Sequence, residues 1–183
     1  MGTATSGDTK LAYSVEGDGK ETVLLVMGLG GRASDWGTAF PDALAEKYRV
    51  VRFDNRGVGA SPMAPGGYVL SDLARDATAV LDAVSADKAH VIGVSMGGMI
   101  SQLVALEHPA RVNKLVLLST NFGGVTLEPP HPDAMRLFDP GEFIARVVIL
   151  AAIHAGEHDR PRSGPPLIVA DDFGDRSIGV FDA

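Results

Sequence analysis

The sequence predicts one α/β domain in which a mostly parallel central sheet is flanked by helices. Its apolar runs of valine, leucine and isoleucine are continuous rather than alternating, as in parallel strands that are buried on both faces. Longer segments of helical period separate these runs. The 183 residues suffice for one domain with a sizeable core but not for two. The expected parallel strands are residues 22–28, 48–54, 89–95 and 112–119.

The first element should be an antiparallel strand, "KLAYSVEG" at residues 10–17, that leads into the sheet. It is expected to turn through the glycine-containing segment 17–19 into the first buried strand. The first crossover helix is expected within residues 34–48. Ser34 or Asp35 is its candidate N-cap, because these side chains accept hydrogen bonds from the free amides of a first helical turn.

Two further helices connect the later strands. Residues 70–86 should form the second crossover helix, with Ser71 or Asp72 as its N-cap. The helix after the third parallel strand should run from Met96 to about Glu107. The second crossover helix carries apolar side chains at helical spacing on one face, and these are Leu73, Ala77, Val80, Leu81 and Val84.

The composition narrows the classes of partner. A net charge of −7 with no basic patch argues against capture of nucleic acid or of an anionic membrane surface. Cysteine is absent, which excludes disulfides, thiolate metal sites and cysteine nucleophiles. The N-terminus "MGTATSGDTK" lacks the pattern of a signal peptide, and no run approaches the ~20 apolar residues that span a bilayer. We therefore expect a cytoplasmic protein.

The pentapeptide "GVSMG" at residues 93–97 indicates a nucleophilic serine, Ser95. A match to G-x-S-x-G alone is weak, since this composition gives one by chance roughly 0.15 times. Here, however, an apolar strand precedes the serine and a helix follows it, which is the context that the motif requires. Gly93 and Gly97 would let strand and helix approach, and the Met96 amide at the helix start would stabilise an oxyanion.

Two more motifs occur in a consistent order. The strand "TVLLV" is followed by a glycine-rich turn, "MGLGGRASDW", and the next strand by "FDNRGVGAS". Together with the elbow around Ser95, they resemble the α/β-hydrolase family over about residues 10–145. The resemblance implies that the backbone amide of Leu29, after the motif glycine Gly28, is the second oxyanion donor. It also implies that Asp54 and Arg56 hold loops in place and do not take part in the chemistry.

The resemblance is nearest to small-ester and lactone hydrolases, including enol-lactonases, methylesterases and perhydrolase-like members. It therefore implies hydrolysis of a small carboxylic ester or lactone through an acyl-enzyme on Ser95. No cofactor or metal is expected, because "MGLGG" lacks G-x-G-x-x-G spacing and no carboxylate and histidine cluster has metal-ligand spacing. The alternatives are a catalytically incomplete member that binds a small ligand or a protein partner, and a fragment that does not fold stably.

The general base is the open question. The family order is serine, then acid, then histidine. The segment "PPLIVADDFGD" resembles the strand before the acid and suggests Asp171 or Asp172. Only eleven residues follow Asp172, none of them histidine, whereas a further helix, strand and histidine loop need roughly 25. The family order therefore does not close a triad within this chain.

The five histidines divide by position in the sequence. His90 precedes the nucleophile at the far end of its strand, and His108 ends the helix after it, so both should be structural. His131 lies in a proline-rich loop where a solvated role is expected. His154 and His158 are the late candidates for the base, and another chain is the alternative source.

The C-terminal part departs from the family pattern. We expect a core over residues 1–145 and an atypical tail over 146–183, as a partial cap or as an altered or truncated segment that lacks the family's usual last strands. The strand 112–119 would then have an open apolar edge, which favours homo-oligomers or aggregation. Alternatively the run "LIVA" at 167–170 covers that edge.

Overall fold

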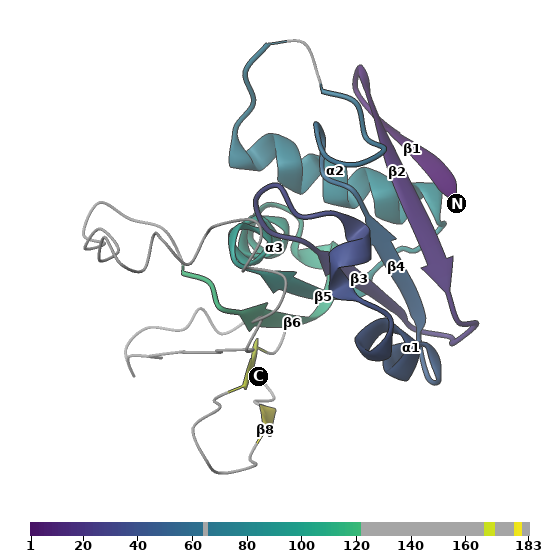
Figure 1. The fold of residues 1–183 in the computed structure, drawn as a ribbon. Helices are drawn as coiled ribbons and strands as arrows, with labels where there is room; N and C mark the ends of the chain where they lie inside the picture. The colour runs from purple at the N-terminus through teal and green to yellow at the C-terminus, as the bar shows by residue number, and fades with distance from the viewer. Residues whose placement is uncertain (64–65, 122–166, 171–177, 181–183) are drawn as a thin grey trace, which may run out of the picture.

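The computed structural model describes residues 1–63, 66–121, 167–170 and 178–180 (Figure 1). They form one eight-stranded sheet in the order β1-β2-β4-β3-β5-β6-β7-β8. Strands β4, β3, β5, β6 and β7 are parallel, and antiparallel pairs stand at both ends. The strands are β1 (Gly2–Ser6), β2 (Thr9–Glu16), β3 (Thr22–Val26), β4 (Arg49–Phe53), β5 (Ala89–Val94), β6 (Val112–Leu118), β7 (Leu167–Ala170) and β8 (Ile178–Val180).

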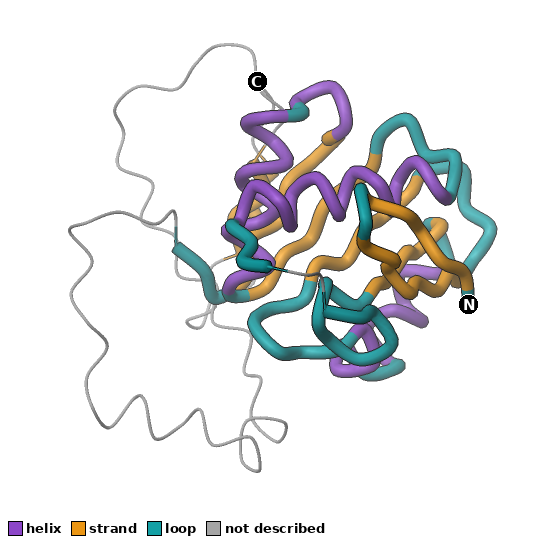
Figure 2. Tube along the Cα trace, turned by 90° about the horizontal axis from the view of Figure 1, so that it is seen from above, coloured by secondary structure: helices purple, strands orange, loops and turns teal. Residues whose placement is uncertain are grey.

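Helices cover both faces of the sheet, as the sequence predicts. Figures 1 and 2 show α2 (Leu70–Ala83) and α3 (Met96–Glu107) on one face and α1 (Ala39–Ala45) on the other. Alternate residues of β3 enter the two cores: Leu24 packs in the cluster under α2 and α3, and Leu25 in the cluster under α1. Both side chains are fully buried, which explains why the apolar run of this strand is continuous.

The prediction of the first crossover helix was wrong at its start. A short 3₁₀ helix occupies Ala33–Trp36, and α1 begins only at Ala39, so neither Ser34 nor Asp35 is its N-cap. Gly37 lies between the two helices at φ 67°, a left-handed conformation that interrupts a right-handed helix.

The N-cap of α2 was also predicted too late in the sequence, by two residues for Ser71 and by three for Asp72. The N-cap is Val69, so Ser71 and Asp72 lie in the first turn. The Asp72 carboxylate accepts a hydrogen bond of 2.8 Å from the Val69 amide and caps the helix from inside. The predicted apolar face is confirmed, because its five residues are all buried, namely Leu73, Ala77, Val80, Leu81 and Val84.

The N-terminal strands correct a third expectation. The predicted strand 10–17 is β2, but it pairs antiparallel with β4 and does not lie beside β3. Strand β1 precedes it and pairs with it antiparallel. The segment that connects β2 to β3 therefore passes over β4 instead of closing a hairpin.

The edge of β6 is covered, which was one of the two alternatives for it. The run "LIVA" forms β7, parallel to β6, with Leu115 opposite Leu167. Strand β8 then pairs antiparallel with β7. The open edge at β6 on which we based homo-oligomerisation is therefore absent. The domain boundary near residue 145 lies outside the described residues and stays a prediction.

Candidate active site

Ser95 lies in a sharp turn between the end of β5 and the start of α3, as the sequence predicts. Its backbone has φ 54° and ψ −124°, a conformation that residues with a Cβ atom rarely adopt. The Ser95 amide donates to the Leu118 carbonyl at 2.9 Å. Its carbonyl accepts hydrogen bonds from the Gly98 amide at 2.9 Å and from Thr120 Oγ1 at 2.6 Å. Bonds from β6, α3 and Thr120 thus hold the turn.

The glycines of the motif allow close approach between elements. A methyl group at Gly93 would collide with the Gly97 carbonyl and the Ser101 hydroxyl, both in α3. A methyl group at Gly97 would collide with the Val26 carbonyl at the end of β3. The helix after the serine therefore packs directly on two strand ends, and its first amides are brought to the carboxyl edge of the sheet.

The turn after β3 lies beside the serine. A methyl group at Gly28 would lie 3.1 Å from Ser95 Cβ and 3.6 Å from Oγ. The Gly31 amide donates to the Gly28 carbonyl at 3.3 Å, and Gly30 has φ 69°, the pattern of a type II turn with Leu29 as its first central residue. Leu29 is 81% exposed, so packing in the core does not explain why a leucine stands at this position. The oxyanion roles of the Leu29 and Met96 amides remain predictions.

Asn55 supports this turn and was not predicted from the sequence. Its side chain is buried and donates from Nδ2 to the Met27 carbonyl at 3.0 Å. Asn55 is the second residue after β4, next to Asp54. A polar residue near a strand end was therefore the only sign of this role in the sequence. The bond fixes the Met27–Gly28 peptide, which follows β3 and leads into the turn beside Ser95.

Asp54 connects two loops, in agreement with the expectation. Its Oδ1 accepts a hydrogen bond of 2.7 Å from the Ala33 amide, and its Oδ2 one of 2.9 Å from the Ala60 amide. Ala33 belongs to the segment after β3, which contains the glycine-rich turn, whereas Ala60 belongs to the loop after β4. One buried carboxylate therefore sets the distance between these loops.

Arg56 anchors the loop after β4 to α2. Its Nε and one terminal nitrogen each bind a carboxylate oxygen of Asp76 at 2.6 Å, and Asp76 is fully buried. The hydrogen bonds to Asp76 raise the pKa of Arg56, although burial acts in the opposite direction. The Arg56 guanidinium also lies 5.5 Å from the centre of the Tyr68 ring. This pair is structural, as expected.

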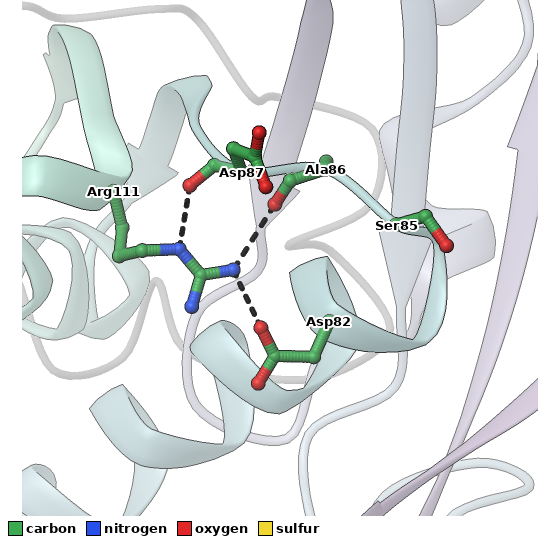
Figure 3. A pocket seen from close by; sticks show the side chains of 5 residues that line it. All are labelled: Asp82, Ser85, Ala86, Asp87 and Arg111. Carbon is green, nitrogen blue, oxygen red and sulfur yellow. Dashed lines mark hydrogen bonds and ion pairs between the residues drawn. The ribbon is translucent and has the colours of Figure 1, made fainter.

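Two open depressions lie at opposite ends of α2. One, of about 390 Å³, is at the far end of α2, where the Arg111 guanidinium donates to the carbonyls of Asp87 and Ala86 and pairs with Asp82 (Figure 3). The other, of about 560 Å³, includes Met96, next to the nucleophile. Its remaining lining residues are Tyr68, Val69, Leu70, Ser71 and Leu73.

The sequence model of the alpha/beta hydrolase fold matches residues 21–146. The chain belongs to this family. A protein named carbamate hydrolase RutD from Variovorax paradoxus is 39% identical over 145 residues, which are 78% of this chain and 50% of that relative. The chain thus spans about half the length of the curated relatives it matches.

Solved structures agree with the family. A hydrolase from Pseudomonas aeruginosa is 38% identical, with a TM-score of 0.62 over 69% of this chain and 46% of that one. The enol-lactonase from Burkholderia xenovorans is 30% identical, with a TM-score of 0.58 over 62% of this chain and 45% of that one. The resemblance drawn from the three motifs is therefore confirmed for the family and the fold.

The α/β-hydrolase site lacks a base within the described residues. His90 lies on β5, five residues and about 16 Å of strand from Ser95, with Nε2 3.5 Å from Glu21. His108 is the C-cap of α3. Both are therefore structural, as predicted. The other candidates all lie outside the described residues, and these are His131, His154, His158, Asp171 and Asp172.

Within the ranges that the structure describes, no group of three or more histidine, aspartate or glutamate side chains is placed to hold a metal ion. In the same ranges, no helix combines the length and apolarity needed to cross a bilayer.

Proposed function

We propose that this α/β-hydrolase family member is a serine hydrolase that cleaves small carboxylic esters or lactones. The observation that carries the proposal is the strained turn at Ser95, with the Gly28 turn packed against it. Such a turn presents the hydroxyl at the carboxyl edge of the sheet, next to the free amides of a helix start. The relatives named for carbamate and enol-lactone hydrolysis support this class, because both names describe attack on a carbonyl that carries a heteroatom.

The reaction has two balanced steps. Ser95 Oγ attacks the carbonyl carbon, the new Oγ–C bond replaces the bond to the alcohol oxygen, and the serine proton passes through the base to that alcohol. Water then attacks the acyl-enzyme, which releases the acid and restores the hydroxyl. The Leu29 and Met96 amides would stabilise the oxyanion of both tetrahedral intermediates.

The candidates for the base and the acid rest on their position in the sequence alone, because the family order does not close a triad within this chain. His154 or His158 would accept the serine proton, with Asp171 or Asp172 to orient it; otherwise a second copy of the chain supplies the histidine. Losing the triad histidine lowers turnover by about 10⁶, whereas the oxyanion hole and binding keep about 10³ over water. Covalent labelling is therefore a more sensitive test than turnover.

A fluorophosphonate probe tests the nucleophile directly. The full 183-residue chain should take up one equivalent by intact mass, and Ser95→Ala should take up none. Ser85→Ala is the matched control, because Ser85 is also a serine with positive φ but lies after the C-terminal end of α2. A folded chain that stays unlabelled would contradict the proposal and would favour ligand binding without chemistry.

A further inference from the structure

The depression beside Met96 is apolar and close to the nucleophile. Its volume of about 560 Å³ lies within the range of small-molecule sites, and none of its six lining residues carries a charge. Two of these residues, Tyr68 and Ser71, carry a hydroxyl group, and that of Ser71 donates to Glu107 Oε1 at 2.9 Å. The lining therefore offers contact to hydrocarbon and no counter-charge to an ionic group.

Apolar side chains are unusually exposed around this part of the molecule. Val69 is 65% exposed and Tyr68 is 39% exposed, and both line the depression. Leu29 and Met63, on the loops after β3 and β4, are 81% and 63% exposed. These four are a majority of the seven large apolar side chains exposed among the described residues, and all lie at the carboxyl edge of the sheet.

The walls of the depression are held in place. Val69 precedes α2, and its amide is bound by Asp72 at 2.8 Å. The Tyr68 ring lies 5.5 Å from the Arg56 guanidinium, which the buried Asp76 fixes in turn. Leu73 is 2% exposed and forms part of the main core. A ligand would thus meet a preformed surface, which lowers the cost of ordering it.

The depression and the proposed reaction centre share one residue, Met96. Met96 lines the depression, and the Met96 amide is also one of the two proposed oxyanion donors. Because Met96 follows Ser95 directly in the chain, the depression lies beside the residue that would carry the acyl group.

We propose that this depression holds the acyl chain of the substrate. The protein would then prefer esters with uncharged acyl chains of medium length to acetates and to esters whose acyl chain ends in a carboxylate. This inference rests on the proposed function, since it takes Ser95 as the nucleophile. Val69 and Tyr68 are then the residues that determine acyl specificity.

p-Nitrophenyl esters from acetate to hexanoate test the inference on the full chain, with Ser95→Ala as the background. A fully buried methylene gives about fourfold, so half burial in an open depression gives about twofold per methylene and about 15-fold in kcat/KM from acetate to hexanoate. Val69→Ser should lower the ratio of the hexanoate to the acetate kcat/KM about threefold. Serine is a better N-cap than valine, so α2 is retained.

Leu106→Ser is the matched control, because Leu106 is 76% exposed near the other end of α3. It should change neither ester. Equal rates across the acyl series in a chain that is labelled at Ser95 would overturn the inference and leave the proposed function standing. A length dependence seen only in alkyl acetates, or one unchanged by Val69→Ser, would overturn it too. If release of p-nitrophenol is the same in Ser95→Ala, both proposals fall.

Discussion

Replacing Ser95 with glycine removes the proposed nucleophile and also relieves a strained backbone. Ser95 has φ 54° and ψ −124°, close to the mirror image of an ordinary turn position, where a Cβ atom crowds the neighbouring peptides. Glycine adopts this conformation without that crowding. We therefore expect Ser95→Gly to be more stable than Ser95→Ala, which keeps the Cβ atom.

The expected gain follows from two opposing terms. A non-glycine residue in such a conformation costs about 1–3 kcal/mol. Relief of this strain by glycine is offset by about 0.5–1 kcal/mol, because glycine gives the unfolded chain more conformational freedom. The free energy of unfolding should therefore rise by about 1 kcal/mol relative to Ser95→Ala, which for a chain of this size raises Tm by about 2–4 °C.

Ser85 provides an internal standard for this comparison. It has φ 55° directly after the C-cap of α2, and the Ser85 and Ala86 amides donate at 2.9 Å to the carbonyls of Asp82 and Leu81. These two bonds define a Schellman motif, in which glycine is the preferred residue. Ser85→Gly should raise Tm by a similar amount and should leave labelling of Ser95 unchanged.

Urea unfolding followed by circular dichroism, with the labelling assay beside it, separates the possible results. Ser95→Gly should unfold at higher urea than Ser95→Ala, and neither should be labelled. If both variants unfold at the same urea concentration while Ser85→Gly is stabilised, the turn at Ser95 is not strained and the reasoning is refuted.

Other substitutions test the supports of the site. Asp76→Ala leaves the mostly buried Arg56 guanidinium without its partner and should cost about 3 kcal/mol in urea unfolding, whereas Asp82→Ala, in a more exposed pair, should cost less than about 1 kcal/mol. Gly97→Ala should abolish probe labelling, because its methyl group would collide with the end of β3; unchanged labelling would contradict the close packing. The hydrogen bond from the Val69 amide, with help from Arg75, lowers the pKa of Asp72. Because this pKa is lower in the folded state, its stabilisation is complete above about pH 4 and disappears as the pH falls below that value, so Asp72→Ala should reduce the loss of stability on acidification.

The sequence was informative wherever a pattern is local. The continuous runs at 22–28 and 89–95 predicted β3 and β5, because burial on both faces makes most positions in such a strand apolar. The elbow at Ser95 was predictable for the same reason, since G-x-S-x-G acquires meaning from the strand before it and the helix after it.

Features that depend on contacts through space were missed. Strand β1 has one fully buried apolar residue, Ala4, so its sequence carries almost no strand pattern. Pairing of β2 with β4 reflects sheet topology and not the turn that follows β2. Asn55 reaches a carbonyl 28 residues away, for which a single sequence holds no signal. The start of α2 was misplaced because Asp72 caps it from the first turn instead of preceding it.

The double role of the Asp54 carboxylate limits how this active site can be altered. Since one carboxylate accepts hydrogen bonds from amides of both the β3 loop and the β4 loop, the position of each loop depends on that of the other. A loop grafted from another hydrolase would have to present its amide to the same oxygen, or displace its neighbour. Exchange of the two segments as a pair, with Asp54 between them, is therefore the smallest transplant that preserves the geometry around Ser95.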